Sequence, residues 1–514
     1  MLPPDLVLFT WPLVVILLFR FMSFKSAVVW SIVAGYLLLP SSSHTSWDVP
    51  LLPPVDKRNV PALATAVVAA IILHRMTENT MLRRAEIPDA LTGVLVGWLP
   101  RSLVGQVLIV TMVIGVVMTV QTNEQPLVYG PRVITGLGLP DILAMSTELG
   151  FMILPFLIGR KFLSNSAGHK ILLVALCVAG SAYAVLAMYE VRMSPQLNTF
   201  FYGFFPHSWT QHLRGGGFRP LVFLDHGLRL GIFLSCATIA AAVLTRIDKS
   251  HRPQYFFAFL WLFAALFLSK TLGAFLSALI LIPVAFLFST RLQLLAAAVV
   301  AIVVLTYPLL RSIDLVPTDA AIALAERVDT DRAASLLYRF ENEDILLDKA
   351  RERPLFGWGK WSRARVFDEN GNDISTTDGA WVILIGENGW IGYITQFGLL
   401  TIPIVLLAFR SKRDPMDPAT AGLALALSAI LLDLLPNSPI TPVLFLIAGA
   451  LIGRLEIVGK EIKTVALAPS GTSAIRHTRF PTDKIRGGHQ PIPGRVGRGE
   501  VFRSQASKRS KTTQ

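Results

Sequence analysis

The chain has 514 residues, of which 53% are hydrophobic and only 16% are charged, and its formal net charge is +13. A soluble globular domain carries about 25% charged residues, so this composition excludes an ordinary water-soluble protein. A helix that crosses a lipid bilayer needs roughly 20 mostly apolar residues, and such runs recur along almost the whole sequence.

The apolar runs predict an all-α fold, a polytopic transmembrane helical bundle with about 12–14 spans. The two cysteines, Cys177 and Cys236, lie inside such runs, so no disulfide is expected. The expected spans are Leu6–Met22, Ala27–Leu39, Val60–Leu73, Leu103–Gln121, Asp141–Ile158, Ile171–Tyr189, Leu221–Thr245, Tyr255–Ser269, Leu272–Ser289, Leu292–Leu310, Trp381–Phe409, Thr420–Leu435 and Pro442–Leu455.

Short basic loops set the expected orientation. Arg160, Arg246, Arg410 and Arg454 belong to four loops or span ends that alternation places on one side, and lysine- and arginine-rich loops face the cytoplasm. The chain then divides into N-terminal transmembrane helices (1–190), central transmembrane helices with a short outer loop at 191–220 (191–310), a large outer loop with helices (311–380), C-terminal transmembrane helices (381–455) and a tail (456–514).

The tail holds much of the positive charge. Between Lys460 and Gln514 there are 12 Lys and Arg against 3 Asp and Glu, with many Gly, Pro and Ser residues and no apolar period. This pattern predicts a disordered, cytoplasmic tail. Contact with anionic membrane lipids is favoured over nucleic-acid binding, and no nucleic-acid partner is expected.

No soluble-enzyme motif is present. The sequence has no phosphate-binding glycine loop, no dinucleotide fingerprint and no C-x-x-C, and its nine histidines show no metal-ligand spacing. We therefore expect neither a metal nor a cofactor.

Cationic residues near the outer ends of spans are the first candidates for chemistry. Arg214 and Arg219 lie in a glycine-rich stretch, and His226 follows at the start of a span. Forked guanidinium donors suit phosphate oxygens, whereas Asp225 and Arg229 at i, i+4 could simply stabilise a helix end. Lys270, between two apolar runs, is either a phosphate ligand or a snorkelling lysine.

The large loop and the start of the next span supply the other candidates. Aromatic and cationic side chains together suit sugars and phosphates, although an ordinary solvated loop of mixed charge would look similar. These residues are Arg339, Trp358, Lys360, Arg363, Arg365, Asp378 and Glu387.

Four motifs follow one another along the second half of the chain. They are Leu268–Gly273, Glu352–Gly359, Gly386–Gly392 and Asp433–Gly449. In this order they resemble the "L-S-R-G" element, the "rPlfGxG" loop element, the "E-x-G-x-x-G" helix and the closing pair of spans of the O-antigen ligase and polymerase superfamily.

The resemblance implies a lipid-carrier glycosyltransferase of the bacterial inner membrane. Such enzymes move a glycan from undecaprenyl diphosphate to an acceptor glycan or lipid at the periplasmic face, which makes the large loop periplasmic. By this resemblance Arg214, Arg219 and Lys270 would bind the diphosphate, while Arg339, Arg363 and Arg365 would contact phosphate or sugar, with Trp358 nearby.

Two departures from the family pattern affect the expected chemistry. Thr377-Asp378 stands where ligases carry His-Asn, and Lys270 stands where they carry Arg. A carboxylate can replace histidine as a base, so Asp378, and after it His226 or Glu387, would take the acceptor proton. The departures favour a polysaccharide polymerase or a divergent relative over a lipid A-core ligase.

Two other classes of function stay open on the sequence. One is a transporter or flippase of a lipid-linked or anionic polysaccharide, although the sequence lacks the inverted repeats typical of transporters. The other is a non-catalytic scaffold of an envelope assembly complex.

Overall fold

The computed structural model describes residues 1–41, 45–46, 53–83, 93–214, 216–327, 330–438 and 440–467. Helices account for most of these residues, which confirms the all-α class of a polytopic membrane protein. The rest of the predicted basic tail, from residue 468 onward, lies outside the described residues.

Seven helices in the described part are long and apolar enough to cross a membrane. They are α1 (Pro4–Phe21), α4 (Leu103–Gln121), α5 (Leu139–Phe162), α6 (Ser166–Met193), α8 (Gly227–Ile247), α11 (Thr290–Ser312) and α14 (Ala380–Arg410). Shorter apolar helices are α2 (Phe24–Leu38), α9 (Arg252–Leu268), α10 (Leu272–Leu287), α15 (Pro418–Asp433) and the first part of α3 (Val60–Arg83). A last helix, α16 (Pro442–Leu467), runs beyond the expected span end at Leu455.

Helix α8 lies at the centre of the bundle and packs against α6, α9, α10 and α15. Its sequence is apolar on all sides, as a fully buried helix requires. Small residues allow the close approach of its neighbours: a Cβ atom on Gly180 of α6 would lie only 2.4 Å from the Cβ of Ala237, and one on Gly422 of α15 only 2.3 Å from Val243.

The expected start of this central span at Leu221 is wrong, because α8 begins at Gly227. The buried Glu190 carboxylate accepts hydrogen bonds from the backbone N–H groups of Leu221 and Val222, at 2.9 and 2.7 Å. Val222 also has a positive φ of 57°. These contacts hold the segment as a turn, although its side chains are apolar.

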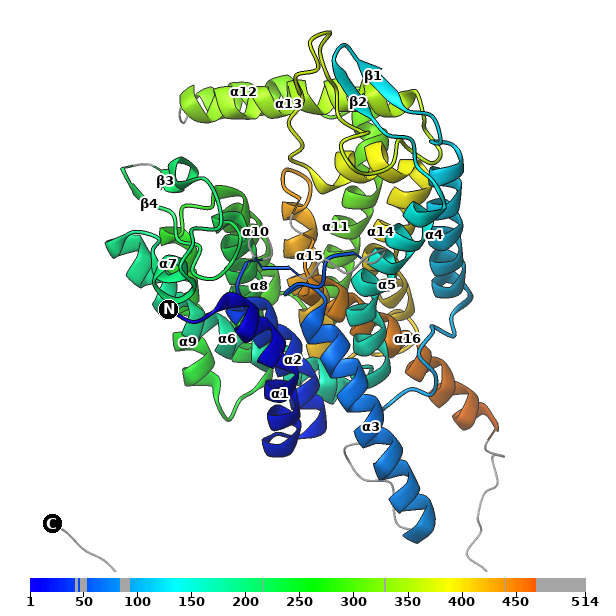
Figure 1. Cartoon of the computed structure of the whole chain (residues 1–514). Helices are drawn as coiled ribbons and strands as arrows, with labels where there is room; N and C mark the ends of the chain where they lie inside the picture. Colours follow the sequence, from blue (N-terminus) through cyan, green and yellow to red (C-terminus); the bar gives the residue numbers. More distant parts are fainter. Residues whose placement is uncertain are drawn as a thin grey trace, which may run out of the picture. The chain divides into compact units, whose positions relative to one another are not determined.

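The large loop carries α12 (Thr318–Glu326) and α13 (Thr330–Arg351), and the second confirms the helix predicted there. Two β-hairpins were not predicted: β1 (Leu127–Tyr129) with β2 (Arg132–Ile134), and β3 (Leu213–Arg214) with β4 (Gly217–Phe218). Figure 1 shows both hairpins and the two loop helices at the same end of the bundle. Short α7 (Leu197–Tyr202) and the 3-10 turn η2 (Trp209–His212) precede the second hairpin.

Candidate functional site

Helix α14 is interrupted at Gly389, whose φ of 64° and ψ of −171° are not helical. A continuous helix would pair the carbonyls of Gly386 and Glu387 with the N–H groups of Trp390 and Ile391. The interruption frees all four groups within an apolar segment, where unpaired backbone groups are costly.

The large-loop motif Glu352–Gly359 supplies the four missing partners. Its N–H groups donate to the two freed carbonyls at 2.8 Å each, and its carbonyls accept from the two freed N–H groups at 2.8 and 3.2 Å. The loop residues are Trp358, Gly359, Pro354 and Leu355. The two motifs of the family resemblance therefore form one backbone unit that fixes the loop on α14.

Arg363 is fully buried and holds this unit together. Its Nε donates to the carbonyl of Trp358 at 3.0 Å, and its two Nη atoms donate to the carbonyls of Thr135 at 2.7 Å and Gln125 at 3.1 Å. The guanidinium is thus used by backbone carbonyls of the loop and of the first hairpin. Because these contacts occupy the guanidinium, we do not include Arg363 in the site proposed below.

The Trp358 side chain also has its contacts within the protein. Two cations lie over its ring, with Lys349 Nζ 3.6 Å and Arg353 Cζ 4.4 Å from the ring centroid. Its indole N–H donates to the carbonyl of Lys349 at 2.8 Å, and only 6% of the residue is exposed. This aromatic residue packs the loop, so we also leave it out of the proposed binding site.

The β3–β4 hairpin and the turn between α9 and α10 bring three basic residues together. Lys270 Nζ donates to the carbonyl of Arg214 at 2.7 Å, and an Nη of Arg219 lies 3.4 Å from the hydroxyl of Thr271. Arg219 is 5% exposed, and its Nε has no hydrogen-bond partner among the described residues. A buried donor without a partner is what an anionic ligand would satisfy.

Charges from distant parts of the chain act on Arg219. Burial, together with the nearby charges of Arg214 and Arg339, lowers the pKa of its guanidinium to about 10. The carboxylate of Asp433 opposes this shift. Arg214, Arg219, Lys270 and Arg339, which we call the basic cluster, therefore converge from the hairpin, the α9–α10 turn and α13.

Two carboxylates belong to the same region. Asp378, which is 40% exposed in its side chain, forms an ion pair with Arg339 through Oδ2 and Nε at 3.5 Å. Asp433 is 2% exposed, and its Oδ2 has no hydrogen-bond partner in the described structure. The N–H of Ala380 donates to the carbonyls of Leu434 and Asn437, so the two acidic segments are joined through the backbone.

Asp433 was absent from the site residues predicted from the sequence. The signal that could have found it is a carboxylate at the end of an otherwise apolar helix, since acidic groups in such positions are costly and often functional.

Arg365 lies beside the predicted base. Its Nη1 donates to Asp373 Oδ2 at 2.6 Å and its Nη2 to the hydroxyl of Thr377 at 3.4 Å. The ion pair with Asp373 fixes the turn that precedes Asp378, so Arg365 can position this segment.

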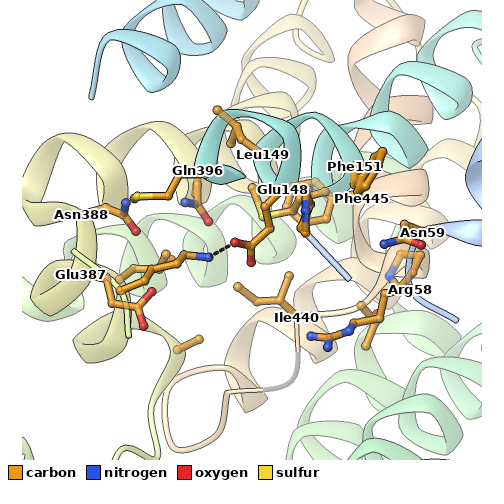
Figure 2. Close-up of a pocket in the computed structure, with 18 of the residues that line it drawn as sticks. Arg58, Asn59, Glu148, Leu149, Phe151, Glu387, Asn388, Gln396, Ile440 and Phe445 are labelled. Carbon is orange, nitrogen blue, oxygen red and sulfur yellow. Dashed lines mark ion pairs between the residues drawn. The ribbon is translucent and has the colours of Figure 1, made fainter. Parts of the chain in front are cut away.

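Glu387 lines a separate cavity of about 440 Å³, shown in Figure 2. Lys360, from the loop motif region, pairs there with Glu148 of α5 at 2.5 Å. None of the basic-cluster residues lines this cavity, nor does Asp378. The structure thus separates Glu387 from the basic cluster, whereas Asp378 pairs with Arg339 of that cluster.

His226, the third predicted base, is the N-cap of α8. Its Nδ1 accepts a hydrogen bond from the N–H of Leu228 at 3.0 Å. Burial lowers the pKa of the imidazole to about 3, helped by the charge of Arg219. A ring whose acceptor nitrogen already caps a helix is a poor proton acceptor, and we do not retain it as the base.

No curated protein matches the chain. Residues 257–406 match the family model described as O-Antigen ligase, a stretch that includes Lys270, the large loop, Asp378 and the interrupted first half of α14. Our sequence-based resemblance to the O-antigen ligase superfamily is thereby confirmed, through a domain at residues 257–406 of this multi-pass membrane protein.

Proposed function

We propose that the protein transfers a glycan from undecaprenyl diphosphate to an acceptor hydroxyl at the periplasmic face of the bacterial inner membrane. The acceptor is a glycan or a lipid, as in a polysaccharide polymerase or a ligase. The observation that carries the proposal is that Arg339, whose charge acts on the buried Arg219, also forms an ion pair with the partly exposed carboxylate of Asp378.

The cluster suits the leaving group. In the reaction, the bond between the anomeric carbon of the glycan and a diphosphate oxygen breaks, and negative charge develops on that oxygen. Arg214 and Arg219 offer forked donors to phosphate, and Lys270 adds a point charge. Fixed positive groups aimed at developing charge stabilise the transition state without reorganisation.

Asp378 suits the role of base. The acceptor oxygen forms the new bond to the anomeric carbon, and its proton passes to the carboxylate. The ion pair with Arg339 fixes the orientation of Asp378, while its partial exposure leaves it open to an acceptor. Positioned acid–base groups contribute roughly 10²–10⁴-fold to the rate.

The test is complementation of a deletion strain, with surface polysaccharide sized on gels and membrane abundance measured by immunoblot. Arg214→Lys and Arg219→Lys each replace a forked guanidinium by a single ammonium group. Each should lower polymer formation about 10- to 100-fold. The matched control is Arg351→Lys, because Arg351 is 58% exposed in its side chain and, within the described part of the chain, forms an ion pair only with Asp348.

The phenotype of the deletion strain separates the classes of function. Shortened polymers identify a polymerase, and full-length polymer missing from its anchor identifies a ligase. Carrier-linked repeats trapped on the cytoplasmic side would identify a flippase and overturn the proposal. Wild-type polymer from both arginine variants would also overturn it.

A further inference from the structure

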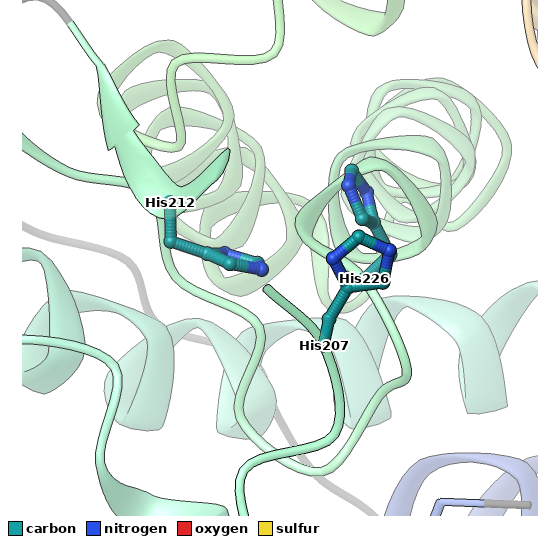
Figure 3. A group of neighbouring side chains, drawn as sticks. All are labelled: His207, His212 and His226. Carbon is teal, nitrogen blue, oxygen red and sulfur yellow. The ribbon is translucent and has the colours of Figure 1, made fainter. Parts of the chain in front are cut away.

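Three histidines from one short stretch of the sequence, residues 207–226, lie together beside the second hairpin. His207 follows α7, His212 ends η2, and His226 caps α8 (Figure 3). One ring nitrogen from each lies within 4.8 Å of the others. The ring centroid of His226 is 4.6 Å from that of His207 and 5.4 Å from that of His212.

The burial and hydrogen bonding of His212 are those of a metal-binding histidine. The residue is fully buried, and its Nδ1 lies 3.1 Å from the carbonyl of Arg219, to which an Nδ1–H would donate. In that tautomer Nε2 carries the lone pair, and Nε2 has no partner among the described residues. Metal-binding histidines usually donate their second ring N–H to a carbonyl or carboxylate in this way.

The three rings offer neutral imidazole nitrogens, which transition metals bind well. Burial lowers the pKa of His212 to about 4 and that of His226 to about 3, so both rings are uncharged at neutral pH. Imidazole ligands suit Zn²⁺, Cu²⁺ and Ni²⁺, whereas Ca²⁺ and Mg²⁺ take oxygen ligands. His207 is exposed, which gives an ion a route from solvent.

We propose that His207, His212 and His226 form a binding site for a first-row transition-metal dication such as Zn²⁺. Three imidazoles leave the fourth tetrahedral position open to water or to another ligand. The site would lie next to Arg219, through the backbone contact of His212.

Two features make the site weaker than a closed structural zinc site. Ligands on tetrahedral zinc at roughly 2.0–2.1 Å are about 3.3 Å apart, so the rings must approach one another. His226 Nδ1 now accepts from Leu228 N–H, and Nε2 faces Gln211 Oε1 at 3.3 Å. Binding through Nε2 would exchange these contacts, at a cost of about 1 kcal/mol per hydrogen bond.

Nearby positive charges also lower the expected affinity for a metal ion. Arg219 and Arg229 both lie close enough to His226 to lower its pKa, and they repel a dication. Asp225 does not compensate, since Lys57 and Arg229 already pair with its carboxylate. We therefore expect reversible, saturable binding of one ion, with an affinity below that of a four-ligand structural site.

The test uses the full chain, purified without a polyhistidine tag and freed of metal by chelation. ZnCl₂ is titrated by calorimetry, and bound zinc is measured by mass spectrometry after dialysis. We expect about one Zn²⁺ per chain beyond the amount bound by a His207→Ala/His212→Ala/His226→Ala variant. That variant keeps His477 and His489, so their contribution cancels.

Single variants separate ligation from folding. His226→Asn keeps a good N-cap acceptor but removes the imidazole, and His207→Ala alters an exposed side chain. Each should weaken zinc binding by about 100-fold or more, since even partners of a ligand change affinity about 10- to 100-fold. His251→Ala, in the α8–α9 loop, should have no effect. Equal zinc binding by the wild type and the triple variant would overturn the proposal.

Discussion

The backbone N–H of Trp358 donates to the carbonyl of Gly386 at 2.8 Å, and this bond joins the large loop to the interruption in α14. The glycine at the interruption makes the bond possible. Because the loop and the helix complete each other's backbone hydrogen bonds, we expect neither to keep its structure alone.

Gly389→Ala should therefore disrupt the loop. Gly389 has a positive φ of 64°, and a Cβ there would lie 2.2 Å from the carbonyl oxygen of Leu355. We expect lower thermal stability in detergent, by at least the roughly 1–3 kcal/mol of a strained backbone, and faster loop proteolysis. Gly97→Ala is the control, because Gly97 has φ 78° but nothing within 4 Å of its Cβ position. Equal losses in both variants would mean that only backbone strain matters.

Arg363→Ala should destabilise the protein before it affects substrate binding. The change would leave the carbonyls of Thr135 and Gln125 without these charged donors, at a cost of at least about 2 kcal/mol. Thermal unfolding and limited proteolysis measure the effect, with exposed Arg351→Ala as the control. Normal stability with lost activity would instead favour the ligand-binding role predicted from the sequence.

Asp378→Asn and Glu387→Gln distinguish the two remaining candidate bases. Each change keeps the side-chain shape and removes the proton acceptor. We expect Asp378→Asn to lower polymer formation about 100-fold or more, and Glu387→Gln to lower it much less, since Glu387 lines the separate cavity. Polysaccharide sizing at equal membrane abundance is the measurement. The reverse order of effects would assign the base to Glu387.

The stability of the loop should depend on pH through Glu343 of α13. Burial raises the pKa of this carboxyl to about 7, although Arg311 Nε lies 3.6 Å from its Oε2. The folded chain then binds more protons than the unfolded chain between about pH 4.5 and 7, so stability falls as pH rises through this range.

Glu343→Gln should remove this dependence. We expect it to raise stability at pH 8 by on the order of 1 kcal/mol and to change little at pH 4.5. Thermal unfolding at the two pH values is the measurement, and exposed Glu341→Gln is the control. Destabilisation by Glu343→Gln at pH 8 would show that the ion pair with Arg311 outweighs the burial of the charge.

Reporter fusions test the orientation. Fusions at Ser250 and Ser411 should report the cytoplasm, and a fusion at Asn370 the periplasm, because basic loops stay inside. A cytoplasmic signal at Asn370 would reverse the topology and remove the acceptor face from the proposed reaction.

The sequence by itself determined the class of this protein, the positions of most helices and the resemblance that the family model matches at residues 257–406. Apolar runs of this length have only lipid or a protein core as a stable environment, and the motifs around Lys270, Gly357 and Glu387 are local in the chain. Helices were also expected within the large loop, and α13 spans Thr330–Arg351 of it.

Only the tertiary structure shows which partners each polar side chain has. Arg219 and Arg363 are both arginines beside glycine-rich segments, yet Arg363 bonds carbonyls more than 200 residues away, while Arg219 keeps a buried donor without a partner among the described residues. Asp433 was missed for the same reason. Spacing along the chain carries no information on contacts that form only when distant segments pack together.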